Sequence, residues 1–122
     1  MKKVFGSLPS GLVSRACVTA ALLAAVCSAK TAHAGEEELK KLMLSNNCMA
    51  CHMIDKRKYG PQFIEVSEKY SGETGAASKL AAKIKAGGTG VWGEDVMPPQ
   101  PQVSDADAQA IAELILALKP AK

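Results

Sequence analysis

The sequence predicts an all-α fold, and three observations lead to it. After the first 34 residues, four segments carry apolar residues at helical spacing, and none alternates apolar and polar residues as a strand does. Gly- and Pro-rich stretches separate these segments, so each helix is expected to be short. A pentad, Cys48-Met49-Ala50-Cys51-His52, places two thiols and an imidazole at i, i+3 and i+4, which is one face of a helix. We therefore expect a small helical domain organised around this pentad.

The first 34 residues have the pattern of a secretory signal peptide. A basic start at residues 1–3 is followed by an apolar run over 16–29 and by Ala32-His33-Ala34, which has the small-x-small form of a cleavage site. The apolar run is short for a membrane span, and an N-terminal anchor that stays uncleaved is the alternative. We expect residues 1–34 to be removed and residues 35–122 to form one domain without a membrane span.

The expected domain differs from the whole chain in its charge and in its reactive side chains. It keeps two of the four cysteines and one of the two histidines, all within the pentad. It holds 11 Lys and Arg against 12 Asp and Glu, so its net charge is −1, whereas the whole chain carries +3. Nothing in this balance suggests nucleic acid as a partner. A domain of this size has a marginal core by itself, and a bound apolar group would enlarge that core.

Four helices are expected in the domain, each identified by a stripe of apolar residues. They cover residues 36–46, 62–70, 76–86 and 105–119. The first opens with three glutamates, which the positive end of the helix dipole favours, and Leu39, Leu42 and Met43 form its stripe. The last follows Ser104, a good N-cap, with Asp107 in the capping-box position. We expect the first and last helices to cross each other.

The segments between the helices are expected to be defined loops. A basic loop over 54–61 ends in Gly60-Pro61, a turn covers 71–75, and the glycines of 87–90 stop the third helix. The stretch 91–103 contains three prolines, which cannot continue a helix and which favour extended geometry in the residue before them.

The pentad has the C-x-x-C-H form that marks covalent attachment of a c-type haem. In such a site, Cys48 and Cys51 form thioethers with the two vinyl groups, and His52 coordinates the iron from the same side. A disulfide or a thioredoxin-like redox pair is an alternative, but the latter requires strand–helix alternation that the domain lacks. A zinc site would require more Cys or His ligands than this single turn provides.

The second axial ligand of such an iron can be sought among the methionines, because the domain has no second histidine. The candidates are Met43, Met49, Met53 and Met97. Met49 and Met53 are held on the His52 side, and Met43 belongs to an apolar stripe, where core packing is expected. Met97 lies far enough downstream to return on the opposite face, and Pro98-Pro99 stiffens the chain behind it. We expect Met97 to bind the iron.

Ligation by His52 and Met97 would decide the class of function. With both axial positions filled, no open position remains for oxygen or peroxide, and a methionine ligand raises the reduction potential. The domain is then expected to carry electrons and not to be an enzyme. The rival interpretation is a haem enzyme or gas sensor, such as a small peroxidase, which requires a vacant distal position and a distal His or Arg.

The domain resembles the small bacterial class I monohaem cytochromes c of the c-551 type. The resemblance covers residues 36–119, with the motifs in the family's order and spacing. These motifs are the pentad, Gly60-Pro61, Val91-Trp92-Gly93 and Met97-Pro98-Pro99. The resemblance implies the class I cytochrome c fold, with about four helices wrapped around one haem c that Cys48 and Cys51 bind covalently.

The resemblance also implies roles for individual residues. The Pro61 carbonyl would accept a hydrogen bond from His52 Nδ1, and the Trp92 indole would donate to a haem propionate, although core filling is an alternative for this Trp. Lys83 stands where the family often has a basic residue near a propionate, and a solvated helix lysine is the alternative. Gln100 replaces the Asn that relatives carry near the methionine sulfur, so the hydrogen bonding of Met97 is left open.

The expected function is that of a monomeric carrier in the periplasm of a Gram-negative bacterium. It would take single electrons from a quinol-oxidising complex to a terminal oxidase or to a nitrogen-oxide reductase such as nitrite reductase. Basic residues near the haem would steer transient docking with such partners. They are Lys40, Lys41, Lys56, Arg57, Lys58, Lys83 and Lys85. An alternative is a dedicated haem subunit of one dehydrogenase, which would expose an apolar patch.

Overall fold

A computed structural model describes residues 33–118 of the chain. It contains a helix over residues 33–45, a 3-10 turn η1 (Cys48–Ala50), and the helices α2 (Phe63–Tyr70), α3 (Ala76–Ala86) and α4 (Asp105–Leu116). The only strand-like pairing in this part of the chain is an isolated antiparallel bridge between Gly88 and Met97. The prediction of an all-α fold with about four helices is confirmed.

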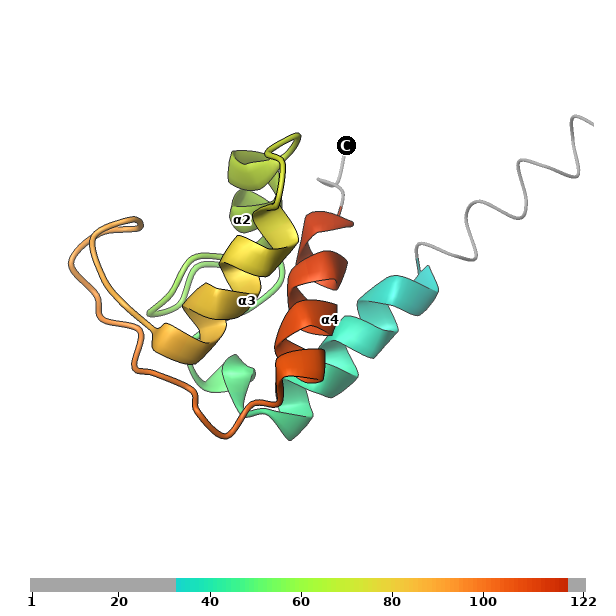
Figure 1. Cartoon of the computed structure of the whole chain (residues 1–122), viewed down its shortest axis with the longest axis horizontal. Coiled ribbons are helices and arrows are strands. Elements are labelled where there is room, and N and C mark those ends of the chain that lie inside the picture. Colours follow the sequence, from blue (N-terminus) through green and yellow to red (C-terminus); the bar gives the residue numbers. More distant parts are fainter. Residues whose placement is uncertain (1–32, 119–122) are drawn as a thin grey trace, which may run out of the picture.

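The helices pack around one apolar core. In Figure 1, α3 and α4 lie side by side. The helix over 33–45 crosses α4 near the first turns of α4. Leu39 and Met43 of the crossing helix are fully buried and belong to the same apolar cluster as Ile111 and Ile115 of α4. The expected crossing of the first and last helices is confirmed, and Met43 is a core residue.

The bounds of α4 agree with its predicted start and differ at its predicted end. Ser104 Oγ accepts a hydrogen bond from Asp107 N at 3.0 Å, which confirms the N-cap. The helix ends at Leu116, and the predicted continuation through residue 118 is wrong. Leu118 N instead bonds to Ile115 O at 3.1 Å, an i→i+3 bond that tightens the last turn. Lys119 lies outside the described residues.

A buried hydroxyl on α2 explains this ending. Ser67 Oγ donates to the carbonyls of Leu116 at 3.3 Å and of Leu118 at 3.0 Å, which have no further helical partner. Ser67 is 6% exposed, so the bond joins α2 to the C-terminal end of α4 inside the domain. The sequence pattern did not predict this contact.

The other predicted bounds need little revision. Helix α3 has its predicted range, and Gly87, with φ 68°, ends it as expected. Helix α2 begins at Phe63, one residue later than predicted, because Gln62 is its N-cap in extended geometry. No helix among residues 33–118 is both long and apolar enough to cross a membrane.

Most of the expected signal peptide, residues 1–32, lies outside the described residues. His33 and Ala34 belong to the first described helix, and both are exposed. Among the described residues, cleavage after Ala34 would therefore remove only these two exposed side chains.

Candidate haem-binding site

One open cavity brings together all six residues that the sequence singled out. It measures about 1280 Å³ with the solvent space at its mouth included, and its floor is apolar. The floor comes from Phe63 and Val66 of α2, Leu80 of α3, and Ile111 and Ile115 of α4. The predicted site residues Cys48, Cys51, His52, Pro61, Trp92 and Met97 all line this cavity.

The pentad is held in a tight turn at one wall of the cavity. Asn47 has a left-handed backbone, with φ 58°, and turns the chain out of the preceding helix. Both Cys51 N and His52 N then bond to Cys48 O, at 3.2 and 3.0 Å. The predicted i, i+3, i+4 face is therefore present as a single 3-10 turn, and the two cysteines are not joined in a disulfide.

The Cys48 thiol differs from a redox-active thiol of the thioredoxin kind. Burial raises the pKa of Cys48 above its usual value, whereas reactive cysteines in C-x-x-C redox motifs have lowered pKa values. The described residues also lack the strand–helix alternation that a thioredoxin-like fold requires, and this is the main ground against that alternative.

His52 is fixed in orientation by the loop that follows it. It is 8% exposed, and its Nδ1 lies 2.9 Å from Pro61 O. Because a carbonyl can only accept, Nδ1 carries the proton and Nε2 keeps a free lone pair. The Phe63 ring stacks on the imidazole with centroids 5.0 Å apart. Gly60 is required here, since a Cβ at this position would collide with the imidazole ring.

Met97 is fastened to the end of α3. Gly88 N bonds to Met97 O and Met97 N to Gly88 O, both at 2.9 Å. A Cβ on Gly87 would collide with the Met97 carbonyl, so only glycine permits this close approach. The side chain of Gln100 donates to Pro98 O at 3.0 Å. Gln100 thus bonds to the backbone of the loop that carries Met97.

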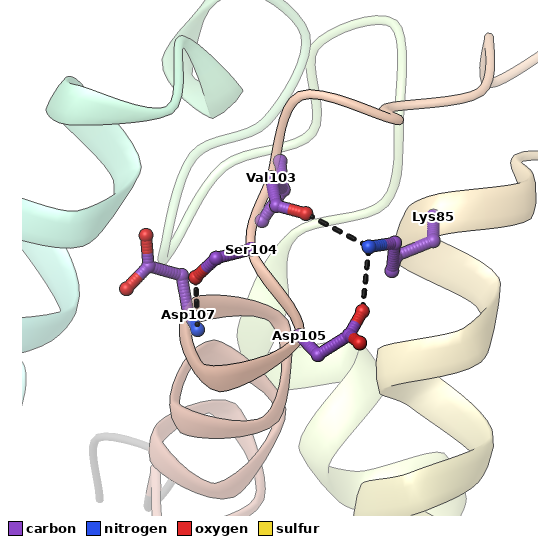
Figure 2. A network of polar contacts seen from close by, with 5 residues as sticks. All are labelled: Lys85, Val103, Ser104, Asp105 and Asp107. Carbon is purple, nitrogen blue, oxygen red and sulfur yellow. Dashed lines mark hydrogen bonds and ion pairs between the residues drawn. The ribbon is translucent and has the colours of Figure 1, made fainter.

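The segment after Met97 is anchored by a polar network between α3 and α4 (Figure 2). Lys85 Nζ donates to Val103 O at 3.1 Å and to Asp105 Oδ1 at 2.6 Å. The hydrogen bond from Lys85 lowers the pKa of the Asp105 carboxyl below its usual value of 3.8, and the lysine charge adds to this shift. Gln100 N also bonds to Lys85 O at 3.0 Å. Both ends of the segment that carries Met97 therefore meet α3.

Met97 is the only methionine among the described residues that lines the cavity. Met43 is buried in the core, and Met49, 36% exposed, does not line the cavity. Trp92 packs partly against the core, with Lys69 Nζ 5.5 Å from its ring centroid. Lys83 also lines the cavity, as expected for a basic residue near the polar edge of a ligand.

The residues around the cavity fit a haem. The apolar floor suits a flat macrocycle, and the two thiols at one wall suit its two vinyl groups. An imidazole with a free Nε2 and a thioether are both donors for iron. An indole and a lysine are available for the carboxylates of the macrocycle.

These features define a class of protein: a small all-α domain that wraps an apolar cavity around a C-x-x-C-H turn and a methionine loop. The chain belongs to the cytochrome c family, whose model, described as Cytochrome c, matches residues 37–119. It binds one haem c covalently through Cys48 and Cys51, and it is a small electron carrier, not an enzyme.

Known relatives support this membership. The chain is 52% identical over 83 residues to cytochrome c-551 of Azotobacter vinelandii, an alignment that covers 68% of this chain and 96% of that one. It is 49% identical over 78 residues to cytochrome c-552 of Nitrosomonas europaea, covering 64% of this chain and 76% of the relative. The crystal structure of Nitrosomonas europaea cytochrome c552 matches with a TM-score of 0.64 at 48% identity, covering 66% of this chain and 99% of that structure.

Proposed function

We propose that His52 and Met97 are the two axial ligands of the haem iron, and that the protein carries single electrons between respiratory complexes in the periplasm. The observation that carries the ligand assignment is that both side chains line one cavity. His52 has its Nδ1 engaged at 2.9 Å by Pro61, and Met97 belongs to a separately anchored loop.

Each ligand is prepared by its own loop. The hydrogen bond from His52 Nδ1 to the Pro61 carbonyl orients the imidazole and increases the donor strength of Nε2. The bridge between Gly88 and Met97 restricts the methionine backbone, so that holding the thioether in place costs little further entropy. When bound, the haem supplies a one-electron couple between ferrous and ferric iron. With His52 and Met97 both holding the iron, no site would remain for oxygen.

The polar edge of the haem would be held by Trp92 and Lys83. Both line the cavity, and the indole Nε1 of Trp92 is a hydrogen-bond donor. A propionate would accept from this indole, as the family resemblance implies, and its charge would be favoured by the nearby Lys83 ammonium.

The mouth of the cavity has an apolar rim that suits transient docking. Tyr59 is 66% exposed, Val91 43% and Val96 70%, and all three line the cavity. A rim of this kind lets a partner approach the bound haem with little desolvation of charge. The rim is also an exposed apolar patch of the kind that a dedicated haem subunit of one dehydrogenase would have. Co-purification tests whether such a stable complex forms.

Only some of the seven basic residues that the sequence assigned to docking lack an ion pair among the described residues. Four of the seven form ion pairs within the chain, and the pairs have N–O distances between 2.6 and 4.0 Å. These four are Lys40, Lys41, Arg57 and Lys85. Lys58 Nζ also donates to Met49 O, at 3.2 Å. Steering of a quinol-oxidising complex, a terminal oxidase or a nitrogen-oxide reductase would therefore depend mainly on Lys56, Lys58 and Lys83.

The proposal is tested by the optical spectrum of the purified holoprotein in both oxidation states, with and without carbon monoxide. His/Met ligation predicts a methionine-to-iron charge-transfer band in the ferric protein and no spectral change when carbon monoxide is added to the ferrous protein. Rapid carbon monoxide binding would identify an open distal position. Fractionation of cells that express the whole chain tests the location, and haem protein retained in the cytoplasm would contradict it.

A further inference from the structure

Arg57 connects the two loops that carry the proposed iron ligands. It lies five residues after His52, in the loop that ends at Pro61, and its Nη2 donates to the backbone carbonyl of Trp92. Trp92 belongs to the loop over residues 88–97, which we name the distal loop because it ends at Met97. The contact joins residues 35 positions apart in the sequence.

Apart from the packing of the Trp92 side chain against the core and beside Lys69, the distal loop has few connections to the body of the domain. Its remaining hydrogen bonds are internal: Gly90 N bonds to Gly93 O at 3.0 Å, and Thr89 Oγ1 bonds to the carbonyls of Glu94 and Asp95 at 3.2 Å. The bridge between Gly88 and Met97 closes only its base. Among the described residues, the Arg57 bond is the only hydrogen bond from the far part of this loop to another segment.

Arg57 is itself held in place from α2. Its Nη1 lies 3.9 Å from Glu65 Oε2. This oxygen is almost inaccessible to solvent and has no hydrogen-bond partner among the described residues. The guanidinium therefore compensates a carboxylate on one side and binds a carbonyl on the other. A planar, forked donor suits both tasks together, whereas a lysine offers one point of charge.

We propose that Arg57 is a positioning residue that keeps the distal loop closed, and with it Met97 on the iron. The inference rests on the proposed ligation by Met97. It adds that a residue which does not bind the iron helps to keep the methionine bound. Opening of the distal loop would lift Trp92 and Met97 together, because they share this loop. The Arg57 bond opposes that opening from the His52 side of the cavity.

The test measures how often the distal loop opens in the whole ferric holoprotein. Imidazole at pH 8, where it is mostly uncharged, replaces the methionine when the loop opens, and the binding rate at saturating imidazole reports the opening step. Arg57→Gln should raise this rate roughly tenfold or more, since a hydrogen bond from a charged donor accounts for one to two factors of ten in an equilibrium constant. The matched control is Lys56→Gln, which removes one neighbouring charge from an exposed side chain. It should leave the rate unchanged.

Three results would overturn the inference. Arg57→Gln could bind imidazole at the wild-type rate, or Lys56→Gln could accelerate binding equally, which would make the effect one of surface charge. The third is a loss in the free energy of unfolding of Arg57→Gln, measured with denaturant, that is as large as the effect on imidazole binding. Such a loss would show that the substitution weakens the whole domain and not the closure of the loop. The proposed function fails differently: if Met97 does not bind the iron, the wild-type protein itself lacks the charge-transfer band and binds imidazole rapidly.

Discussion

Gly88 and Met97 exchange two backbone hydrogen bonds of 2.9 Å, so the proposed thioether ligand is joined directly to the end of α3. This pairing places the methionine loop where the third helix ends. It depends on Gly87, whose missing side chain leaves space for the Met97 carbonyl.

Gly87→Ala should therefore displace the Met97 segment. The new Cβ would collide with the backbone of residues 97–99, and Gly87 also has φ 68°, which an L side chain rarely adopts. We expect a loss of about 1–3 kcal/mol in the free energy of unfolding, together with a weaker charge-transfer band. The control is Gly72→Ala, which has φ 77° but no atom within 4 Å of the new Cβ. An intact band in Gly87→Ala would contradict the argument.

Ser67→Ala should destabilise the domain without affecting the haem spectrum. The substitution leaves the carbonyls of Leu116 and Leu118 without their buried donor, at a cost of about 1–3 kcal/mol. Chemical denaturation of the holoprotein measures the change. Ser78→Ala, an exposed position on α3, is the control and should be close to neutral. Equal stability of the two variants would show that the Ser67 bonds contribute nothing.

The pair of Lys85 and Asp105 predicts a dependence of stability on pH. The folded-state pKa of Asp105 is lowered, so the pair contributes stability above the usual value of 3.8, and this contribution is lost as pH falls through the lowered value. Asp105→Asn should remove that part of the acid dependence. Thermal unfolding between pH 6 and pH 2 measures it, and the two curves should converge at the acid end. Parallel curves would contradict the prediction.

Lys56→Gln should slow electron exchange with an acidic redox partner several-fold at low salt while barely changing the reduction potential. The Lys56 side chain is exposed, and charges of this kind steer encounter within a Debye length, about 10 Å at 0.1 M salt. Lys41→Gln is the control, because Lys41 pairs with Glu38 of its own helix at 4.0 Å. Stopped-flow exchange at several ionic strengths measures both variants. An equal loss in the two would remove the assigned docking role of Lys56.

The sequence predicted the structure correctly where a local pattern of residues is compatible with only one local structure. The range of α3 and the cap at Ser104 follow from helical spacing, glycine and capping chemistry, and the six site residues could be selected by motif, inventory and family resemblance. The core position of Met43 follows from its place in an apolar stripe.

The contacts that the sequence did not predict join distant segments through backbone atoms. Ser67 caps a helix 49 residues away, and Arg57 binds the carbonyl of Trp92 at a separation of 35. Any residue can supply a carbonyl, so no side-chain pattern marks the acceptor. The ion pair of Lys85 with Asp105 was missed for a related reason, since only the folded chain brings α3 beside the start of α4.

The measurement that tests the central claim most directly compares the ferric and ferrous spectra of Met97→Ala with those of Met43→Ala. Met97→Ala should lose the methionine-to-iron band, have a lower reduction potential, and bind carbon monoxide readily when reduced. Met43→Ala should keep the band and lose only stability, by about 2–5 kcal/mol, because Met43 is fully buried in the core. A Met97→Ala protein that retains the band and excludes carbon monoxide would contradict the account, as would loss of the band in Met43→Ala.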